Sequence, residues 1–137
     1  MPEGDFPRYV WHKESREMPF VALMEINDQS SPAFVLREAL PASNLFYFCR
    51  ALFEYLSSST RRSALITDAG TEHQKRNRAF AAEFLVPASV LRTRIEISTV
   101  TREQTEGIAA EFGVSAYIIR YQIENHGIAQ VQDTQDV

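Results

Sequence analysis

The chain has 137 residues, of which 45% are hydrophobic and 11% are aromatic, and its formal net charge is -4. This length allows one domain with a substantial core and leaves too few residues for two domains of ordinary size. The negative charge argues against a general attraction to nucleic acid or to anionic membranes. The single cysteine, Cys49, excludes an internal disulfide and a cysteine-rich zinc site, and it fits a reducing compartment.

Membrane-targeting features are missing from the sequence. The start lacks the charged residues and apolar run that mark a signal peptide, and no apolar stretch approaches the ~18 residues of a membrane-spanning helix. We therefore expect a cytoplasmic protein that has no membrane partner.

The first part of the chain predicts a small amount of β structure. Residues 1–18 combine Pro, Gly and both charges without a period, so we interpret them as an irregular lead-in. Two apolar runs follow at 19–26 and 33–37, with a polar break between them. Short runs separated in this way are typical of neighbouring strands, and we expect a hairpin-like pair.

Residues 43–59 form the most apolar stretch of the chain. Within it, residues 45–56 are all apolar or aromatic except Arg50 and Glu54. These two residues are four positions apart and therefore share one face of a helix. The pattern predicts a buried helix with one charged stripe, and Ser43 is expected to cap its N-terminus.

The chain after residue 59 is predicted to be mainly helical. A brief apolar run at 64–67 fits either a strand or a packed connector. Thr101 and Gln104 match a capping box, and Gly113 is expected to end the helix that follows. Apolar spacing, capping residues and terminating Pro or Gly residues indicate helices at 71–85, 88–95, 101–112 and 115–125.

These elements together predict an α+β fold, with a small β-sheet packed on a mainly helical bundle. We expect a single domain over residues 19–128, followed by a polar, frayed tail at 129–137.

Two segments resemble the ImmA/IrrE family of zinc-peptidase-like proteins. They are QKRNRAFAAEFLVP at 74–87 and IAAEFGVSAYIIRYQIEN at 108–125. In that family a helix with H-E-x-x-H precedes a helix of the form E-x-x-A-N-x-F-A-A-x-L-L-M-P, and a region near L-A-x-x-F-x-V-S follows. The resemblance extends over about residues 34–126 and implies a zincin-like fold. It also implies a bacterial regulatory or stress-response context, because family members cleave or control helix-turn-helix repressors.

The metal-binding residues of the family are substituted in this chain. A zincin uses two His four positions apart as ligands, and a Glu after the first as general base. Laying that motif over residues 49–56 puts Arg50 and Glu54 at the two His positions and Ala51 at the base position. Gln74 stands at the third ligand, a Glu in the family. Arg, Ala and Gln cannot supply this chemistry, so the resemblance implies a non-catalytic domain without a zinc cofactor.

The vacated site allows three interpretations. Our hypothesis is that an Arg50–Glu54 ion pair with Gln74 hydrogen-bonded to it fills the site, with Tyr47, His73 and Arg78 on the rim of the cleft. The first alternative is an ordinary solvated helix face, made by Ser43, Tyr47, Arg50, Glu54 and Ser58. The second is a metallopeptidase with a shifted zinc site of Glu54, Glu72 and His73, although a His at a helix start is far more often a surface residue.

Residues 104–123 also fit a helix-turn-helix pattern, which makes a DNA-binding regulator the rival function. Its core would be formed by Ile108, Phe112, Val114 and Ile119, and its second helix would present Ala116, Tyr117, Arg120, Tyr121 and Glu124. Residues 101–126 carry two Arg against four Glu, whereas phosphate contacts need positive charge. We therefore favour a packing role for this unit, and nucleic acid is not the expected partner.

The expected partner is a protein or peptide, and the resemblance points to a helix-turn-helix regulator. The middle of the chain is locally basic, with Arg61, Arg62, Lys75, Arg76 and Arg78, and this charge would suit an acidic protein partner. An extended peptide would add at the edge of the strand pair around 33–37, because backbone pairing does not depend on the metal.

Overall fold

The structure, a computed structural model, describes residues 8–12, 20–27, 31–37, 39–57, 60 and 62–132. These residues form five helices and two small sheets, so the expected α+β class is confirmed. The chain divides by its internal contacts into two compact units, Met1–Phe80 and Ala81–Val137. The division lies within helix α2 (Glu72–Leu85), and the expectation of one domain over 19–128 stays a prediction.

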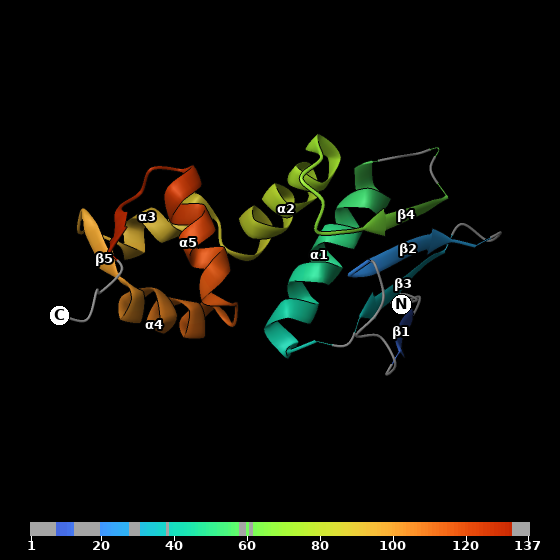
Figure 1. The fold of residues 1–137 in the computed structure, drawn as a ribbon, viewed down its shortest axis with the longest axis horizontal. Coiled ribbons are helices and arrows are strands. Elements are labelled where there is room, and N and C mark those ends of the chain that lie inside the picture. The colour runs from blue at the N-terminus through green and yellow to red at the C-terminus, as the bar shows by residue number, and fades with distance from the viewer. Residues whose placement is uncertain are drawn as a thin grey trace, which may run out of the picture. The chain divides into compact units, whose positions relative to one another are not determined.

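The first unit contains a four-stranded sheet. Its strands are β1 (Arg8–His12), β2 (Ala22–Ile26), β3 (Pro32–Arg37) and β4 (Ser63–Ile66), in the order β1-β3-β2-β4 (Figure 1). Strand β2 is antiparallel to both of its neighbours, which confirms the expected strand pair. The run at 64–67, for which a strand or a connector was open, is strand β4 through Ile66.

Strand β1 corrects two expectations. It lies inside the segment predicted to be an irregular lead-in, and it pairs parallel to β3 with Tyr9 opposite Phe34. The pairing partner is remote in sequence, so no local period marked this strand; residues 1–7 and 13–18 lie outside the described part. Strand β3 consequently has a neighbour on each side, and the free edge expected around 33–37 is wrong. The end strands of this sheet are β1 and β4.

Helix α1 (Pro41–Ser57) packs one face on this sheet. It begins two residues before the predicted Ser43, because the fixed φ of Pro41 suits a first helical turn; Ser58 and Ser59 lie outside the described residues. Phe48 meets Phe34 edge-on, with ring centroids 5.2 Å apart. The buried core consists of Val21, Ala22, Met24, Phe34, Leu36, Ala51, Ala64 and Ile66. Each large side chain in it contributes about 1.5–3 kcal/mol by leaving water.

The second unit contains the remaining helices. They are α3 (Ala88–Arg94), α4 (Arg102–Phe112) and α5 (Ala116–Asn125), close to the predicted ranges. The Thr101 capping box is confirmed, with the Gln104 backbone donating to the Thr101 hydroxyl at 3.2 Å. Gly113 ends α4 at φ 67°, a left-handed conformation that glycine adopts without strain.

A two-stranded sheet and a buried glutamine complete this unit. Strand β5 (Thr99–Thr101) pairs parallel to β6 (Gln130–Gln132), so the prediction of a frayed tail is wrong at 130–132 because these residues have backbone partners. Residues 133–137 lie outside the described part. The Gln122 side chain donates to Val86 O at 2.7 Å and to the Glu83 carboxylate at 2.8 Å. These bonds tie α5 to the end of α2.

None of the described helices combines the length and the apolar character that crossing a bilayer requires.

Candidate functional site

Arg50 is the centre of a buried polar cluster in the first unit. It lies on α1 and is 1% exposed. Its Nε donates to Asn77 Oδ1 at 2.6 Å, and its Nη2 donates to Thr67 O at 2.6 Å and to Gln74 Oε1 at 3.0 Å. The exposed carboxylate of Asp68 lies 3.9 Å from Nη1. A buried guanidinium is tolerated because its donors find acceptors in this way.

Glu54 supplies the buried negative charge of the cluster. It lies one turn after Arg50 on α1 and is 0% exposed. Nε2 of His73, a side chain that is 41% exposed, lies 2.7 Å from this carboxylate. Asn77 Nδ2 donates to Glu54 Oε1 at 3.1 Å. The cluster thus buries a cation and an anion together, which avoids the penalty of several kcal/mol for a lone buried charge.

Asn77 links these two charges. Its carboxamide accepts from Arg50 and donates to Glu54, and it also donates to Gln74 Oε1 at 3.0 Å. The described bonds that join Arg50 to Glu54 therefore run through Asn77. The direct Arg50–Glu54 ion pair that we expected stays a prediction.

Gln74 connects the cluster to strand β4. Its Nε2 donates to Leu65 O at 3.0 Å, and its Oε1 accepts from the backbone N–H of Thr67 at 3.1 Å. The side chains of Arg50, Glu54, His73, Gln74 and Asn77 are called the Arg50 cluster below. They hold α1, α2 and the end of β4 together.

The structure brings three of the four former ligand and base positions into this cluster. Arg50, Glu54 and Gln74 belong to it, whereas Ala51, at the base position, is 0% exposed in the sheet core. The alternative of a solvated face is wrong for Arg50 and Glu54, because α2 and the end of β4 cover that face of α1.

The three predicted rim residues lie in different surroundings. His73 contacts Glu54 and so borders the cluster. Tyr47 packs against the sheet core, with the Arg37 guanidinium 6.0 Å from its ring centroid. Arg78 donates to Ala69 O at 2.8 Å, in the loop before α2.

Asn77, which is 0% exposed, was not among the predicted site residues. It lies three positions after Gln74, so helical spacing alone places both on one face. The family motif has an Ala at this position and gives no sign of a polar residue there. The contribution of Thr67 could not be foreseen, because its backbone rather than its side chain binds Arg50.

The residues of the cluster do not fit the zinc ion that members of the ImmA/IrrE family bind. Arg50 has no lone pair to offer, and both heteroatoms of the Gln74 amide are hydrogen-bonded. In the alternative zinc site of Glu54, Glu72 and His73, the Glu72 carboxylate forms an ion pair with Lys75 at 3.0 Å. No three His, Cys, Asp or Glu side chains among the described residues gather as metal ligands. The buried polar atom without a partner in the described part is Asn44 Oδ1, which none of the cluster's bonds involves.

Cys49 is a core residue of α1. It is 1% exposed, and burial raises the pKa of its thiol to about 11. The thiolate, which is the reactive form, is therefore scarce at neutral pH.

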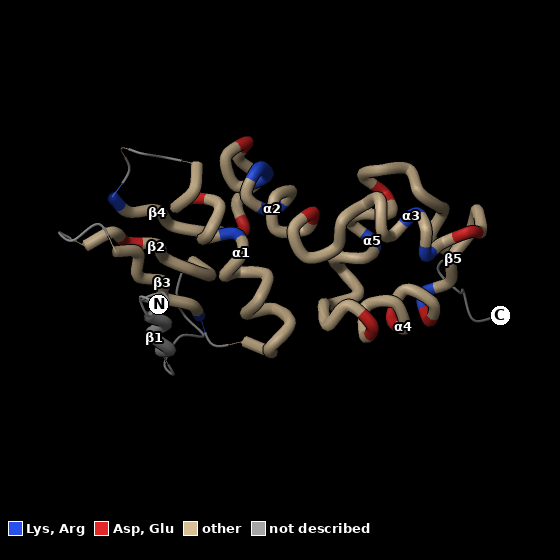
Figure 2. The backbone as a smooth tube through the Cα atoms, turned by 180° about the vertical axis from the view of Figure 1, so that it is seen from behind, with Lys and Arg blue, Asp and Glu red and all other residues tan. Residues whose placement is uncertain are grey.

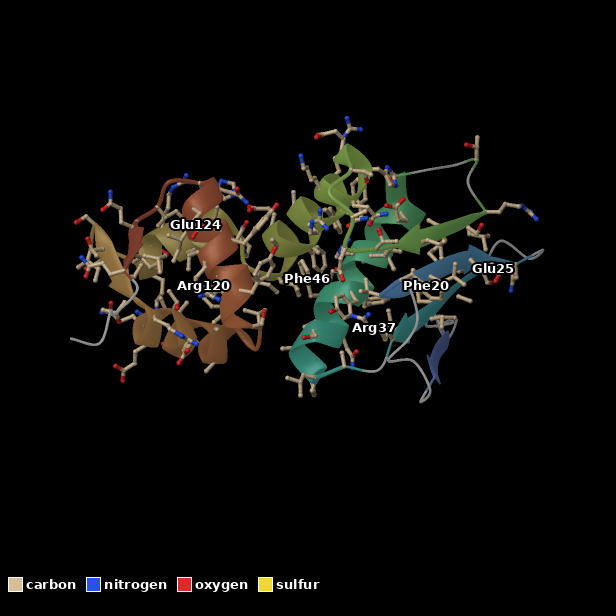
Figure 3. The ribbon with its side chains drawn as sticks, in the orientation of Figure 1. Phe20, Glu25, Arg37, Phe46, Arg120 and Glu124 are labelled. Atoms are coloured by element: carbon tan, nitrogen blue, oxygen red, sulfur yellow. The ribbon has the colours of Figure 1, made fainter. Side chains whose placement is uncertain are left out.

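The helix-turn-helix candidate is formed by α4 and α5. Ile108, Val114 and Ile119 are buried as expected, and Phe112 is partly buried. On α5, Glu124 is exposed and Arg120 is partly buried (Figure 3). Acidic residues recur along α4 (Figure 2). This unit therefore offers phosphate little positive charge.

A hollow of about 640 Å³ in the second unit was not predicted. It lies between α3, β5 and α4, and its apolar lining comes from Ile95, Ile97, Val100 and Ile108. Arg94 and Glu111, joined by two hydrogen bonds, border it. No polar side chain that is both buried and unpartnered in the described part borders this hollow.

Comparison of the chain with protein-family models and with curated proteins gave no match.

Proposed function

We propose that the chain is a degenerate ImmA/IrrE-type domain of zincin-like fold, which is non-catalytic and acts in regulation by binding a protein or peptide. The observation that carries this proposal is the meeting of Arg50, Glu54 and Gln74 in one buried cluster. The resemblance assigns these residues, from two helices, to a single metal site. Their hydrogen bonds through Asn77 and Thr67 support that common location.

The loss of catalysis follows from the chemistry of the cluster. Hydrolysis by a zincin needs a metal-activated water and a carboxylate base. Arg50, which has no lone pair for a metal, directs its donors to Asn77, Gln74 and Thr67, and the small side chain of Ala51 is packed in the sheet core. Glu54 accepts from Asn77 and lies 2.7 Å from His73 Nε2, so its carboxyl group already has partners.

The partner we propose is an acidic protein or peptide in the bacterial cytoplasm, with a helix-turn-helix regulator as the candidate from the resemblance. Arg62 and Arg76 are exposed on this unit, and Arg76 has no partner among the described residues. Regulation of a stress response is the context that family members suggest.

Elemental analysis of zinc, on protein purified without a metal-binding tag, tests this proposal. We expect no stoichiometric zinc and no rise in melting temperature when zinc is added. The same measurement on Glu54→Ala and His73→Ala addresses the shifted zinc site. Stoichiometric zinc that either substitution removes would overturn the non-catalytic proposal in favour of that alternative.

DNA binding by α4 and α5 is the second candidate function. The observation in its favour is the short turn through Gly113 that joins two helices with a shared buried core. A DNA reader requires duplex affinity that falls steeply with salt and weakens in Arg120→Ala. A duplex affinity that changes neither with salt nor with Arg120→Ala would rule out DNA binding as the function.

A further inference from the structure

Strand β4 has an outer edge whose backbone groups can be assigned. Ile66 O accepts from Val21 N at 2.8 Å, and Arg62 O accepts from Ile26 N at 2.7 Å, so both carbonyls point toward the β2 side. Successive strand residues alternate in the direction of their backbone bonds. The backbone N–H and C=O groups of Ser63, Leu65 and Thr67 consequently point away from β2. Because β4 is an end strand of its sheet (Figure 1), that side is an edge.

The Gln74 carboxamide occupies part of this edge as a neighbouring strand would. It donates to Leu65 O at 3.0 Å and accepts from Thr67 N at 3.1 Å. A residue of a parallel strand makes the same two bonds, to a carbonyl and an N–H that lie two residues apart. Arg50 takes the next outward group, Thr67 O, at 2.6 Å. Side chains of α1 and α2 thus stand where an added strand would pair.

Within the described part of the chain, the Gln74 and Arg50 side chains close the C-terminal half of the edge, at Leu65 O and the backbone of Thr67. Strand pairing in proteins commonly runs over about 5–6 residues. An added strand of that length over residues 63–67 would need Leu65 O and Thr67 N, and therefore has to displace the Gln74 amide. Leu65, whose side chain is 52% exposed, offers an apolar contact to such a strand.

The charge around this edge favours an acidic strand. Residues 62–78 contain four Lys or Arg and two Asp or Glu. Arg62 is exposed at the start of β4, and Arg76 is exposed on α2. Opposite charges near a backbone-paired strand improve its selection and register.

We propose that the outer edge of β4, residues 63–67, is a docking edge for an extended acidic peptide and that Gln74 holds it closed. Peptide binding by this unit rests on the proposed function, whereas the closure rests on the bonds of Gln74. The closed edge also resists unwanted pairing with other chains, a known hazard of exposed strand edges.

The test is a titration of the full chain, followed by NMR, with a capped peptide of about six residues that alternates glutamate and valine. The same peptide with lysine replacing glutamate is the charge control. Gln74→Ala should bind the acidic peptide at least about tenfold more tightly than wild type, because no amide has to be displaced; the factor corresponds to about 1.4 kcal/mol. Gln122→Ala is the matched control, since Gln122 is also a buried glutamine that donates to a backbone carbonyl.

A second substitution, Leu65→Pro, tests whether the peptide binds at the outer edge of β4. Leu65→Pro removes an outward N–H and leaves the bonds to β2 intact, so Gln74→Ala with Leu65→Pro should fold and lose the gain in affinity. In the unaltered chain, saturating acidic peptide should slow hydrogen exchange of the Leu65 amide. This second readout serves if Gln74→Ala does not fold.

The outcomes separate this proposal from the proposed function. If neither Gln74→Ala nor Leu65→Pro changes the affinity for the acidic peptide, the β4 edge is not the docking site. Peptide binding at another place on the protein would then still agree with the proposed function. An equal gain in Gln122→Ala, or dimerisation of Gln74→Ala without peptide binding, also overturns the β4 edge. Absence of binding to either peptide by every folded variant, together with an unprotected Leu65 amide, counts against both.

Discussion

Arg50 Nε donates a 2.6 Å hydrogen bond to Asn77 Oδ1, and the two side chains are 1% and 0% exposed. The same Asn77 side chain donates to Glu54. The neutral amide of Asn77 therefore joins the buried cation of α1 to the buried anion of the same helix and anchors both to α2. Each member of the cluster depends on the others for its partners.

Asn77→Ala should destabilise the protein by about 2–4 kcal/mol. The substitution leaves Arg50 Nε and one Glu54 oxygen without their bonds to Asn77, in a place that water does not readily reach. Urea denaturation measures the change. Asn44→Ala is the control, because the Asn44 carbonyl already lacks a partner and its amide makes a bond only to Ala39 O among the described contacts. A smaller loss for Asn77→Ala than for Asn44→Ala contradicts this account of the cluster.

The buried charges should also be energetically coupled. Arg50→Met should cost about 3–5 kcal/mol, because it removes the buried cation of the cluster and leaves the Glu54 carboxylate buried beside His73 and Asn77. Adding Glu54→Gln should cost less in that background than in wild type, with a coupling energy of about 1–3 kcal/mol. Arg50→Met combined with Gln122→Ala, in the other unit, should be additive within about 0.5 kcal/mol. Additivity of the first pair would refute the coupling.

Local patterns predicted most of the regular structure. The apolar spacing around Phe80, the capping box at Thr101 and the stop at Gly113 each act within a few residues, and the helices they indicate are present. The two strands β1 and β6 were missed, because each pairs with a strand far away in the sequence. Pairing with a remote strand leaves no local pattern in the sequence from which either strand could be predicted.

The candidate site was predicted in part for the same reason. Helical spacing identified Arg50 and Glu54 as one stripe, and the resemblance brought Gln74 to them. The direction of the stripe, toward the interior, could not be read from α1 alone. It depends on α2 and on the backbone of Thr67, which has no side-chain signal.

The Arg94–Glu111 pair gives a pH-dependent prediction. A hydrogen bond from Arg94, 2.9 Å from its Nε to Glu111 Oε2, lowers the pKa of the Glu111 carboxyl. A lowered folded pKa means that the pair stabilises the fold above the unfolded pKa of Glu111, and that this contribution disappears as the pH falls through the folded pKa.

Arg94→Ala should therefore raise the Glu111 pKa toward its ordinary value near ~4.3, as carboxyl NMR would record. Both side chains are exposed, so high salt should shrink the difference between variant and wild type. Arg102→Ala, which removes the partner of Glu106, is the control and should leave the Glu111 pKa unchanged. A Glu111 pKa that does not respond to Arg94→Ala contradicts the assignment.

Cys49 should resist thiol reagents in the folded protein. Burial hides the sulfur and raises the pKa of the thiol to about 11, so little thiolate exists at pH 7. Labelling with an aromatic disulfide reagent should follow unfolding in urea rather than mixing time. Rapid and complete labelling of Cys49 in buffer would contradict its burial on α1.

Zinc binding by a restored site would show whether α1 and α2 form a zincin-like pair whose metal ligands have been replaced. The variant combines Arg50→His, Glu54→His and Gln74→Glu with Asn77→Ala, the residue of the family motif, and keeps Ala51, whose position in the sheet core does not accommodate a carboxylate. We expect about one zinc per chain in this variant, none in wild type, and no loss when His73→Ala is added. A folded variant that binds no zinc would mean that α1 and α2 do not form such a pair.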